Sequence, residues 1–278
     1  MPAIYAHEAF GRAVSSQLDG ELAEIIGEHD AQFQIGLQGP DIFFFFGAHT
    51  NNAVVRFGEH LHNVSAAPFF TNAVNVIRQK GRFSPEYAYL CGFVCHFILD
   101  SECHPYVEEM IGKIGVQHLE IEEEFEKFLL KMDGKDPLGY PVADLVPTDM
   151  DTAAAIQPFY PVKPHRWSGG ARREYLSLSI IRESLVSMKL LKRLLTAPQP
   201  WKQNLINGVL QLSGEKNYSH AKGFLNQKID NPKCAETNEG LKERFDEAVF
   251  LAAEMIQSLD VTIQTGGALN RRFDRTFS

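Results

Sequence analysis

The order of apolar and polar positions along this chain follows the period of an α-helix much more often than that of a β-strand. Helical patterns are predicted over 3–18, 21–34, 52–63, 67–80, 84–101, 116–132, 171–196 and 238–264, and a helical start is predicted for 201–230. The proline-rich stretch 133–170 predicts a long ordered excursion without a helix. We therefore expect one all-α domain over residues 1–278, built as a multi-helix bundle.

Composition and charge narrow the class of protein. The chain carries 27 basic and 35 acidic side chains, so it lacks the basic surplus with which proteins bind duplex nucleic acid. No apolar run approaches the roughly 20 residues of a transmembrane helix, and the start of the chain lacks the features of a signal peptide. The four cysteines are expected to be free thiols in a reducing compartment, because a disulfide between Cys91 and Cys95 within one helix would be geometrically awkward. Together these features predict a cytoplasmic protein without a transmembrane segment.

One short apolar stretch, V-C-H-F-I-L-D-S-E-C-H-P-Y at 94–106, contains two histidines and an aspartate. His96, Asp100 and His104 are spaced by four, so they share one face of a helix unless Pro105 opens the last turn. The apolar residues between them predict that this face is buried. A buried imidazole or carboxylate is costly unless it is paired or bound to a metal ion.

A second pair with the same spacing, His118 and Glu122, lies on the helix predicted over 116–132. Taken alone, such a pair is usually a solvated helix pair, and a lone histidine is usually a satisfied core or surface residue. However, eight of the ten histidines fall within residues 1–118, and imidazole with carboxylate suits zinc. The two motifs together favour a metal cluster in the interior of the bundle.

Three segments together resemble the bacterial zinc-dependent phospholipase C family, which shares its all-helical fold with the S1/P1 nucleases. They are G-P-D-I-F-F-F at 39–45, the stretch 94–106, and H-L-E-I-E at 118–122. The matching elements run in the same order from His7 to Glu122, a little under half of the chain. The remaining half is similar only in being helical.

The resemblance implies a cleft with two or three zinc ions and assigns ligands to them. It implies a first site of Asp41, His96, Asp100 and a histidine of G-E-H-L-H, a second site of His104, His118 and Glu122, and a third of Asp100, His7 and the first residue of the processed chain. We prefer His62 to His60 for the first site, because the two lie on opposite sides of a helix and His62 is nearer the pattern of the family. Removal of the initiator methionine would make Pro2 the terminal ligand.

The implied chemistry is hydrolysis of a phosphodiester by a metal-activated water, with Asp41 as the catalytic residue that orients or deprotonates it. The resemblance implies a phospholipid head-group ester or a smaller phosphodiester as substrate. Two alternatives stay open: an S1/P1-like nuclease or nucleotidase that acts on single strands, and a non-enzymatic metal-binding protein that retains the site. The oligomeric state cannot be predicted.

Two further features have more than one interpretation. The aromatic run 43–46 is interpreted as core, with an apolar wall for lipid chains or bases as the alternative. The helix predicted over 171–196 carries a basic stripe, for which a solvated face is expected and a phosphate-facing rim is the alternative. Its members are Arg172, Arg173, Arg182, Lys189, Lys192 and Arg193.

Overall fold

The structure, a computed structural model, describes residues 4–47, 52–137, 139–162, 174–196 and 230–277. Its α-helices are α1 (Ile4–Ser15), α2 (Gly20–Glu28), α3 (Asp30–Gly36), α4 (Ala53–Asn63), α5 (Ala67–Lys80), α6 (Pro85–Ile114), α7 (His118–Met132), α8 (Met150–Ile156), α9 (Leu178–Thr196) and α12 (Ala235–Thr265). Short 3-10 turns are η1 (Gly39–Phe45), η2 (Val142–Leu145), η3 (Gln157–Phe159), η4 (Pro232–Cys234) and η5 (Arg271–Asp274). In the described part, strand structure is limited to β1 (Pro161–Val162), which pairs antiparallel with β2 (Glu174–Tyr175). The prediction of an all-α fold is confirmed.

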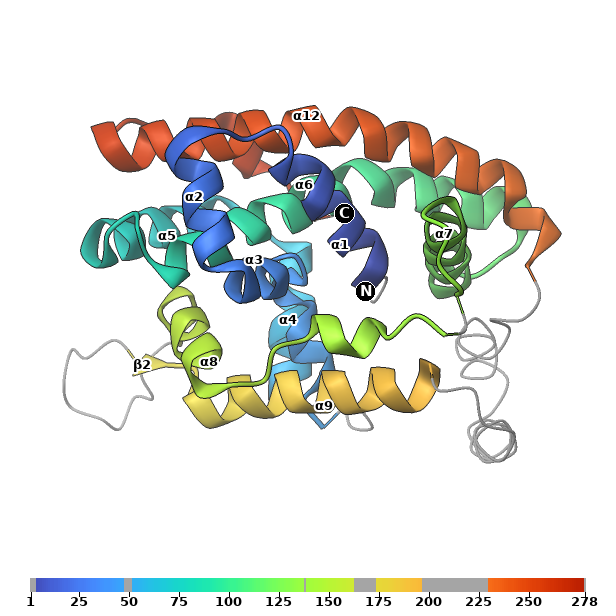
Figure 1. Ribbon diagram of the computed structural model, residues 1–278, viewed down its shortest axis with the longest axis horizontal. Helices are drawn as coiled ribbons and strands as arrows, with labels where there is room; N and C mark the ends of the chain where they lie inside the picture. Colours follow the sequence, from blue (N-terminus) through green and yellow to red (C-terminus); the bar gives the residue numbers. More distant parts are fainter. Residues whose placement is uncertain (1–3, 48–51, 138, 163–173, 197–229, 278) are drawn as a thin grey trace.

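The two longest helices, α6 and α12, lie side by side along one edge of the molecule (Figure 1). Helix α9 runs along the opposite edge and packs against η1, η2 and α8. Helix α1 lies inside, where it contacts α6, α7 and α12. Helix α6 contacts α1, α2, α3, α5, α7, α8, α12 and η1, and it is therefore the element on which most of the described helices pack.

Helix α6 begins at a well-formed cap and continues well beyond the range predicted for it. The Ser84 side chain accepts a hydrogen bond from the Tyr87 N–H, and Pro85 occupies the first turn. The helix ends at Gly115, whose φ of 67° is in the left-handed region. The helix was predicted to end at residue 101, before Pro105, but α6 continues to Ile114, because packing of buried residues such as Val107 outweighs one missing hydrogen bond.

Other predicted ranges also differ from the structure. The range predicted as a helix over 171–196 contains the strand β2 (Glu174–Tyr175), and its helix, α9, begins only at Leu178. The range 21–34 is divided into α2 and α3 at His29, whose φ and ψ of −119° and 41° are not helical. The range 133–170 was predicted to lack a helix, which is wrong for α8. The Asp149 carboxylate caps that helix by accepting the Thr152 N–H at 2.7 Å, and Ala153 and Ile156 are buried. The helix was not predicted because its cap and its short apolar face lie within a proline-rich stretch.

Helices α3 and α6 cross in close contact because each contributes a glycine at the crossing point. A Cβ atom added to Gly36 would lie 2.2 Å from the Tyr89 carbonyl oxygen, and one added to Gly92 would lie 2.2 Å from the Phe33 carbonyl oxygen. The crossing fixes η1, which directly follows α3, against the middle of α6.

The basic stripe on α9 is not a free solvated face. The Lys192 ammonium group is buried and lies 3.8 Å from the Glu123 carboxylate. The other described members contact the segment 144–148. Arg182 donates to the Thr148 carbonyl, Lys189 to the Val146 carbonyl and Arg193 to the Asp144 carboxylate. Arg172, Arg173 and most of 201–230 lie outside the described residues. The stripe therefore attaches α9 to the loop before α8.

Two predictions about the whole chain can be compared with the structure. All four cysteines are free, as expected, and the structure shows that all four are also buried. Among the helices described, none combines the length and the apolar character that a membrane crossing requires.

Candidate metal centre

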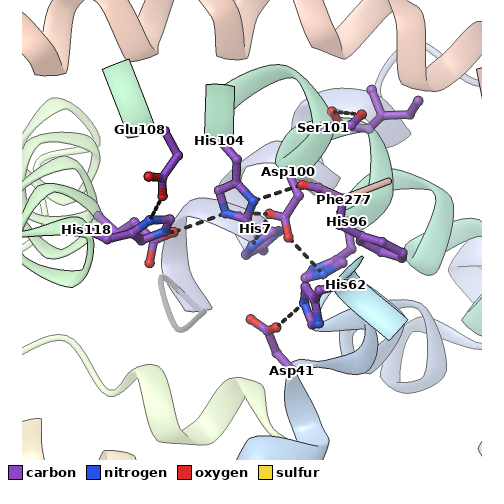
Figure 2. A network of polar contacts seen from close by, with 12 residues as sticks. His7, Asp41, His62, His96, Asp100, Ser101, His104, Glu108, His118 and Phe277 are labelled. Carbon is purple, nitrogen blue, oxygen red and sulfur yellow. Dashed lines mark hydrogen bonds and ion pairs between the residues drawn. The ribbon is translucent and has the colours of Figure 1, made fainter. Parts of the chain in front are cut away.

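Eight histidine and carboxylate side chains from five elements converge on one buried cluster (Figure 2). They form three groups: Asp41, His62 and His96; His7, His96 and Asp100; and His104, His118 and Glu122. Within each group one possible ligand atom of every residue lies within 4.8 Å of the others. The structure thus brings together all eight side chains that the sequence and the family resemblance singled out.

The centre of the cluster is Asp100, which projects from the middle of α6 and is 3 % exposed. One carboxylate oxygen lies 3.2 Å from His96 Nε2. The other lies 3.5 Å from His7 Nε2 and 3.8 Å from His104 Nε2. The Asp100 carboxylate therefore links the group that contains His96 to the group that contains His104, as expected from the spacing of four along one helix face.

The group on η1 and α4 depends on an unusual backbone position. The Asp41 carboxylate is 2.9 Å from His62 Nε2, and His96 completes the group. Gly39 adopts a φ of +49°, and a Cβ atom there would lie 2.2 Å from the His96 ring. Only glycine lets this turn lie against the ring and bring the Asp41 carboxylate into reach.

The structure also separates the two histidines of α4. His62 points into the cluster beside Asp41, whereas His60 is exposed and belongs to none of the three groups. This placement agrees with the preference for His62, although metal ligation itself stays a prediction.

The third group is formed where α6 and α7 meet. A Glu122 carboxylate oxygen lies 2.9 Å from His118 Nε2 and 3.3 Å from His104 Nε2. The Nδ1 atom of His118 contacts the Glu108 carboxylate at 2.8 Å. The predicted interior meeting of the two spaced motifs is therefore present.

Backbone carbonyls orient three of the imidazoles in the same way. The Nδ1–H groups of His62, His96 and His104 donate to the carbonyl oxygens of Gly58, Leu37 and Phe277 at 2.8, 3.1 and 2.8 Å. With Nδ1 held in this way, Nε2 faces the cluster and is the ring nitrogen available to a metal ion, which is how metal-binding histidines are usually held. These acceptors could not be predicted from the sequence, because a backbone carbonyl gives no signal in the residue type.

Phe277 comes from a segment that we call the strap, residues 271–277, which reaches the cluster from beyond α12. The ring of Phe273 is fully buried against Phe70 and Phe97. Arg272 forms an ion pair with Glu102 of α6. The strap also forms a backbone hydrogen bond, 2.9 Å long, from the Ala66 N–H to the Arg275 carbonyl. These contacts hold the Phe277 carbonyl at His104.

Charges in the cluster shift the pKa values of its members in opposite directions. Burial alone would raise the pKa of the Asp100 carboxyl, but the surrounding His96 and His104 hold it well below its usual range. Burial and the neighbouring His96 lower the pKa of His7 to about 3. Although burial opposes it, Asp100 and Glu122 raise the pKa of His104 to about 9. The carboxylates are therefore ionised, and His7 is a neutral donor.

The residues fit a divalent metal of the zinc type. The cluster offers five imidazoles and three carboxylates, which are the nitrogen and oxygen donors of zinc sites. Among the described residues the buried His7 Nδ1 atom has no hydrogen-bond partner.

The aromatic run beside Asp41 is mainly core, since Phe43 and Phe45 are buried, while Phe44 packs on the His62 ring. The proposed terminal ligand Pro2 lies outside the described residues.

Comparison with known proteins gives one match. The family model described as zinc-dependent phospholipase C matches residues 6–168, more than half of the 278 residues, and this span contains all eight clustered side chains. No curated protein and no solved structure matches the chain.

Proposed function

This chain belongs to the zinc-dependent phospholipase C family, and from this premise we propose that it is a zinc-dependent phosphoric diester hydrolase. We propose a phospholipid head-group ester or a smaller phosphodiester as the substrate. The observation that best supports this function is the convergence of three donor groups on one buried cluster. Stability alone does not account for such a cluster, because burying ionisable groups costs free energy unless they are paired or bound to metal.

We assign one proposed zinc ion to each of the three groups of side chains. Asp41, His62 and His96 would hold one zinc ion, and His104, His118 and Glu122 a second. His7 and Asp100 would hold a third, because the one Nε2 lone pair of His96 is used in the first set. When bound, the zinc ions lower the pKa of a coordinated water and stabilise negative charge on phosphoryl oxygens.

Asp41 is the proposed catalytic residue. Burial opposes ionisation of its carboxyl, but His62 and His96 hold the pKa well below the usual range, so the carboxylate is ionised at neutral pH. An ionised carboxylate accepts a hydrogen bond from the attacking water and aligns it with the phosphorus atom. Because the Asp41 carboxylate is a weak base, it is better suited to orienting the attacking water than to taking up the proton of that water.

The test is hydrolysis by the zinc-loaded protein of phosphatidylcholine in mixed micelles and of a soluble chromogenic phosphodiester. Asp41→Asn is expected to lower kcat by roughly 100-fold or more, while the His104–His118–Glu122 group retains its zinc. The matched control is His29→Ala, which removes a half-buried histidine outside the three groups.

Three outcomes would change the proposal. Hydrolysis of neither diester by the zinc-loaded wild type would favour the non-enzymatic metal-binding alternative. Preferential cleavage of single-stranded oligonucleotides would favour the nuclease. Equal losses in Asp41→Asn and His29→Ala would remove Asp41 from the reaction.

A further inference from the structure

Helix α6 carries a fourth member of the spaced series that places His96, Asp100 and His104 on one face. Glu108 follows His104 by four residues, so the same face continues through the turn after Pro105. This turn lies beyond the range over which the sequence predicts a helix. The continuation of α6 past the proline therefore places one more carboxylate beside the metal-ligand cluster (Figure 2).

The Glu108 carboxylate reaches from α6 to α7 and contacts one of the proposed zinc ligands. Its Oε1 atom lies 2.8 Å from His118 Nδ1. An ionised carboxylate only accepts hydrogen bonds, so the Nδ1–H group of the imidazole is the donor in this contact. The Nε2 atom of the same ring, 2.9 Å from the Glu122 carboxylate, is then the nitrogen that faces the proposed zinc site.

The His118 imidazole is held less tightly by packing than the other rings of the cluster. Its side chain is 31 % exposed, whereas that of His104 is 11 % exposed and that of His96 is fully buried. His118 is the first residue of α7, and in the described part of the chain its ring forms no hydrogen bond with a backbone carbonyl. The Glu108 carboxylate therefore takes the place that a backbone carbonyl takes for His62, His96 and His104.

A carboxylate in this place differs from a carbonyl because it carries a full negative charge. The proposed ligand set of His104, His118 and Glu122 contains one carboxylate, so one of the two positive charges of a zinc ion has no opposite charge within the set. A carboxylate that accepts the second N–H of a ligating imidazole fixes the ring and makes it a stronger base. Because the Glu108 side chain is 61 % exposed, water screens part of this effect. The gain in zinc affinity is therefore expected at the lower end of the usual range of about 10- to 100-fold.

We propose that Glu108 is a positioning residue, which orients the His118 imidazole toward the zinc ion that this ring shares with Glu122 and so strengthens the binding of that ion. This inference rests on the zinc centre of the proposed function and does not depend on which diester is hydrolysed. It also gives the continuation of α6 past Pro105 a consequence for the site, since a helix that ended at the proline would not hold Glu108 against α7.

The test is the zinc affinity of the full chain, measured by competition with a chromophoric chelator. Glu108→Ala removes both the hydrogen bond and the charge, and it is expected to weaken the binding of one zinc ion about tenfold. Glu108→Gln keeps an oxygen that can accept the Nδ1–H and loses only the charge, so its affinity should lie between those of wild type and Glu108→Ala. The matched control is Glu109→Ala, which should keep the wild-type affinity, because Glu109 is 52 % exposed and pairs with Lys113 instead of with a member of the cluster.

Two further measurements separate the positioning of His118 from a general effect on the helix. In a His118→Ala background, Glu108→Ala should not change the zinc affinity further, because the effect of Glu108 passes through that ring. In the zinc-loaded protein with isotope-labelled histidine, the Nδ1–H signal that His118→Ala removes should be present in Glu109→Ala and lost in Glu108→Ala, through faster exchange with water. Thermal melting shows that each variant is folded.

The outcomes distinguish this inference from the proposed function. A loss of zinc affinity in Glu108→Ala that is absent from Glu109→Ala and from the His118→Ala background supports the positioning role, and a lack of diester hydrolysis in that case contradicts the hydrolase alone. Wild-type zinc affinity in Glu108→Ala, or an equal loss in Glu109→Ala, overturns the positioning role and leaves the hydrolase in place. A wild type that binds no zinc overturns both.

Discussion

Replacing Phe277 by alanine should weaken zinc binding more than the loss of stability alone would explain. The buried ring contacts His62 and His96, so its removal is expected to lower the free energy of unfolding by roughly 3–5 kcal/mol. Without the ring, the end of the strap no longer holds the carbonyl that accepts the His104 Nδ1–H at 2.8 Å. Loss of such support typically lowers metal affinity by about 10- to 100-fold.

The assay is competition for zinc with a chromophoric chelator, combined with chemical denaturation of each variant. Phe277→Leu should retain most of the affinity, because leucine still fills the space and holds the strap. Phe245→Ala is the control: this buried ring packs on Phe10 and Phe125, and its loss should reduce stability at unchanged zinc affinity. Wild-type zinc affinity in Phe277→Ala, or an equal loss in Phe245→Ala, would show that the strap does not support zinc binding through Phe277.

Three more predictions follow from the backbone and the pKa values. Gly39→Ala places a Cβ atom against His96 at a φ of +49°, so it should reduce the zinc content, measured by mass spectrometry, and lower stability by roughly 1–3 kcal/mol. The metal-free protein holds a proton on His104 up to about pH 9, so zinc binding at pH 7 should release about one proton. Calorimetry in buffers of different ionisation enthalpy measures this release. A release that is the same at pH 10 as at pH 7 would contradict the prediction. Burial raises the pKa of Glu126 to about 8 despite the nearby Lys192 ammonium, so ionisation is less favourable in the folded state and the free energy of unfolding should fall as pH rises from about 4.5 to about 8. In denaturation experiments Glu126→Gln should show less of this fall, and an identical pH profile would exclude it.

The helices and the side chains of the cluster could be predicted because both follow from periodicity. The range predicted for α5 agrees with the structure, and the spacing of four placed His96, Asp100 and His104 on one face of α6. That Asp41 and His7 would join them came from the family resemblance, since no local pattern links them to α6.

Features that depend on tertiary contact could not be predicted. The continuation of α6 through Pro105 follows from packing on its far side, and the propensity of proline argues against it. The carbonyls that orient the imidazoles carry no residue signal, and Phe277 lies 173 positions from His104 along the chain. Charge patterning suggested a solvated stripe on α9, whereas Lys192 is buried beside a carboxylate that only the folded chain brings near.

Whether the buried cluster is a zinc centre is decided by the number of zinc ions bound per chain. Protein purified without chelator or a histidine tag would be measured by mass spectrometry, alongside His118→Ala and the control His29→Ala. We expect two or three zinc ions in the wild type and in His29→Ala, corresponding to the three donor groups, and about one fewer in His118→Ala. A wild type that binds no zinc even after zinc is added would contradict the account and leave the cluster as core packing.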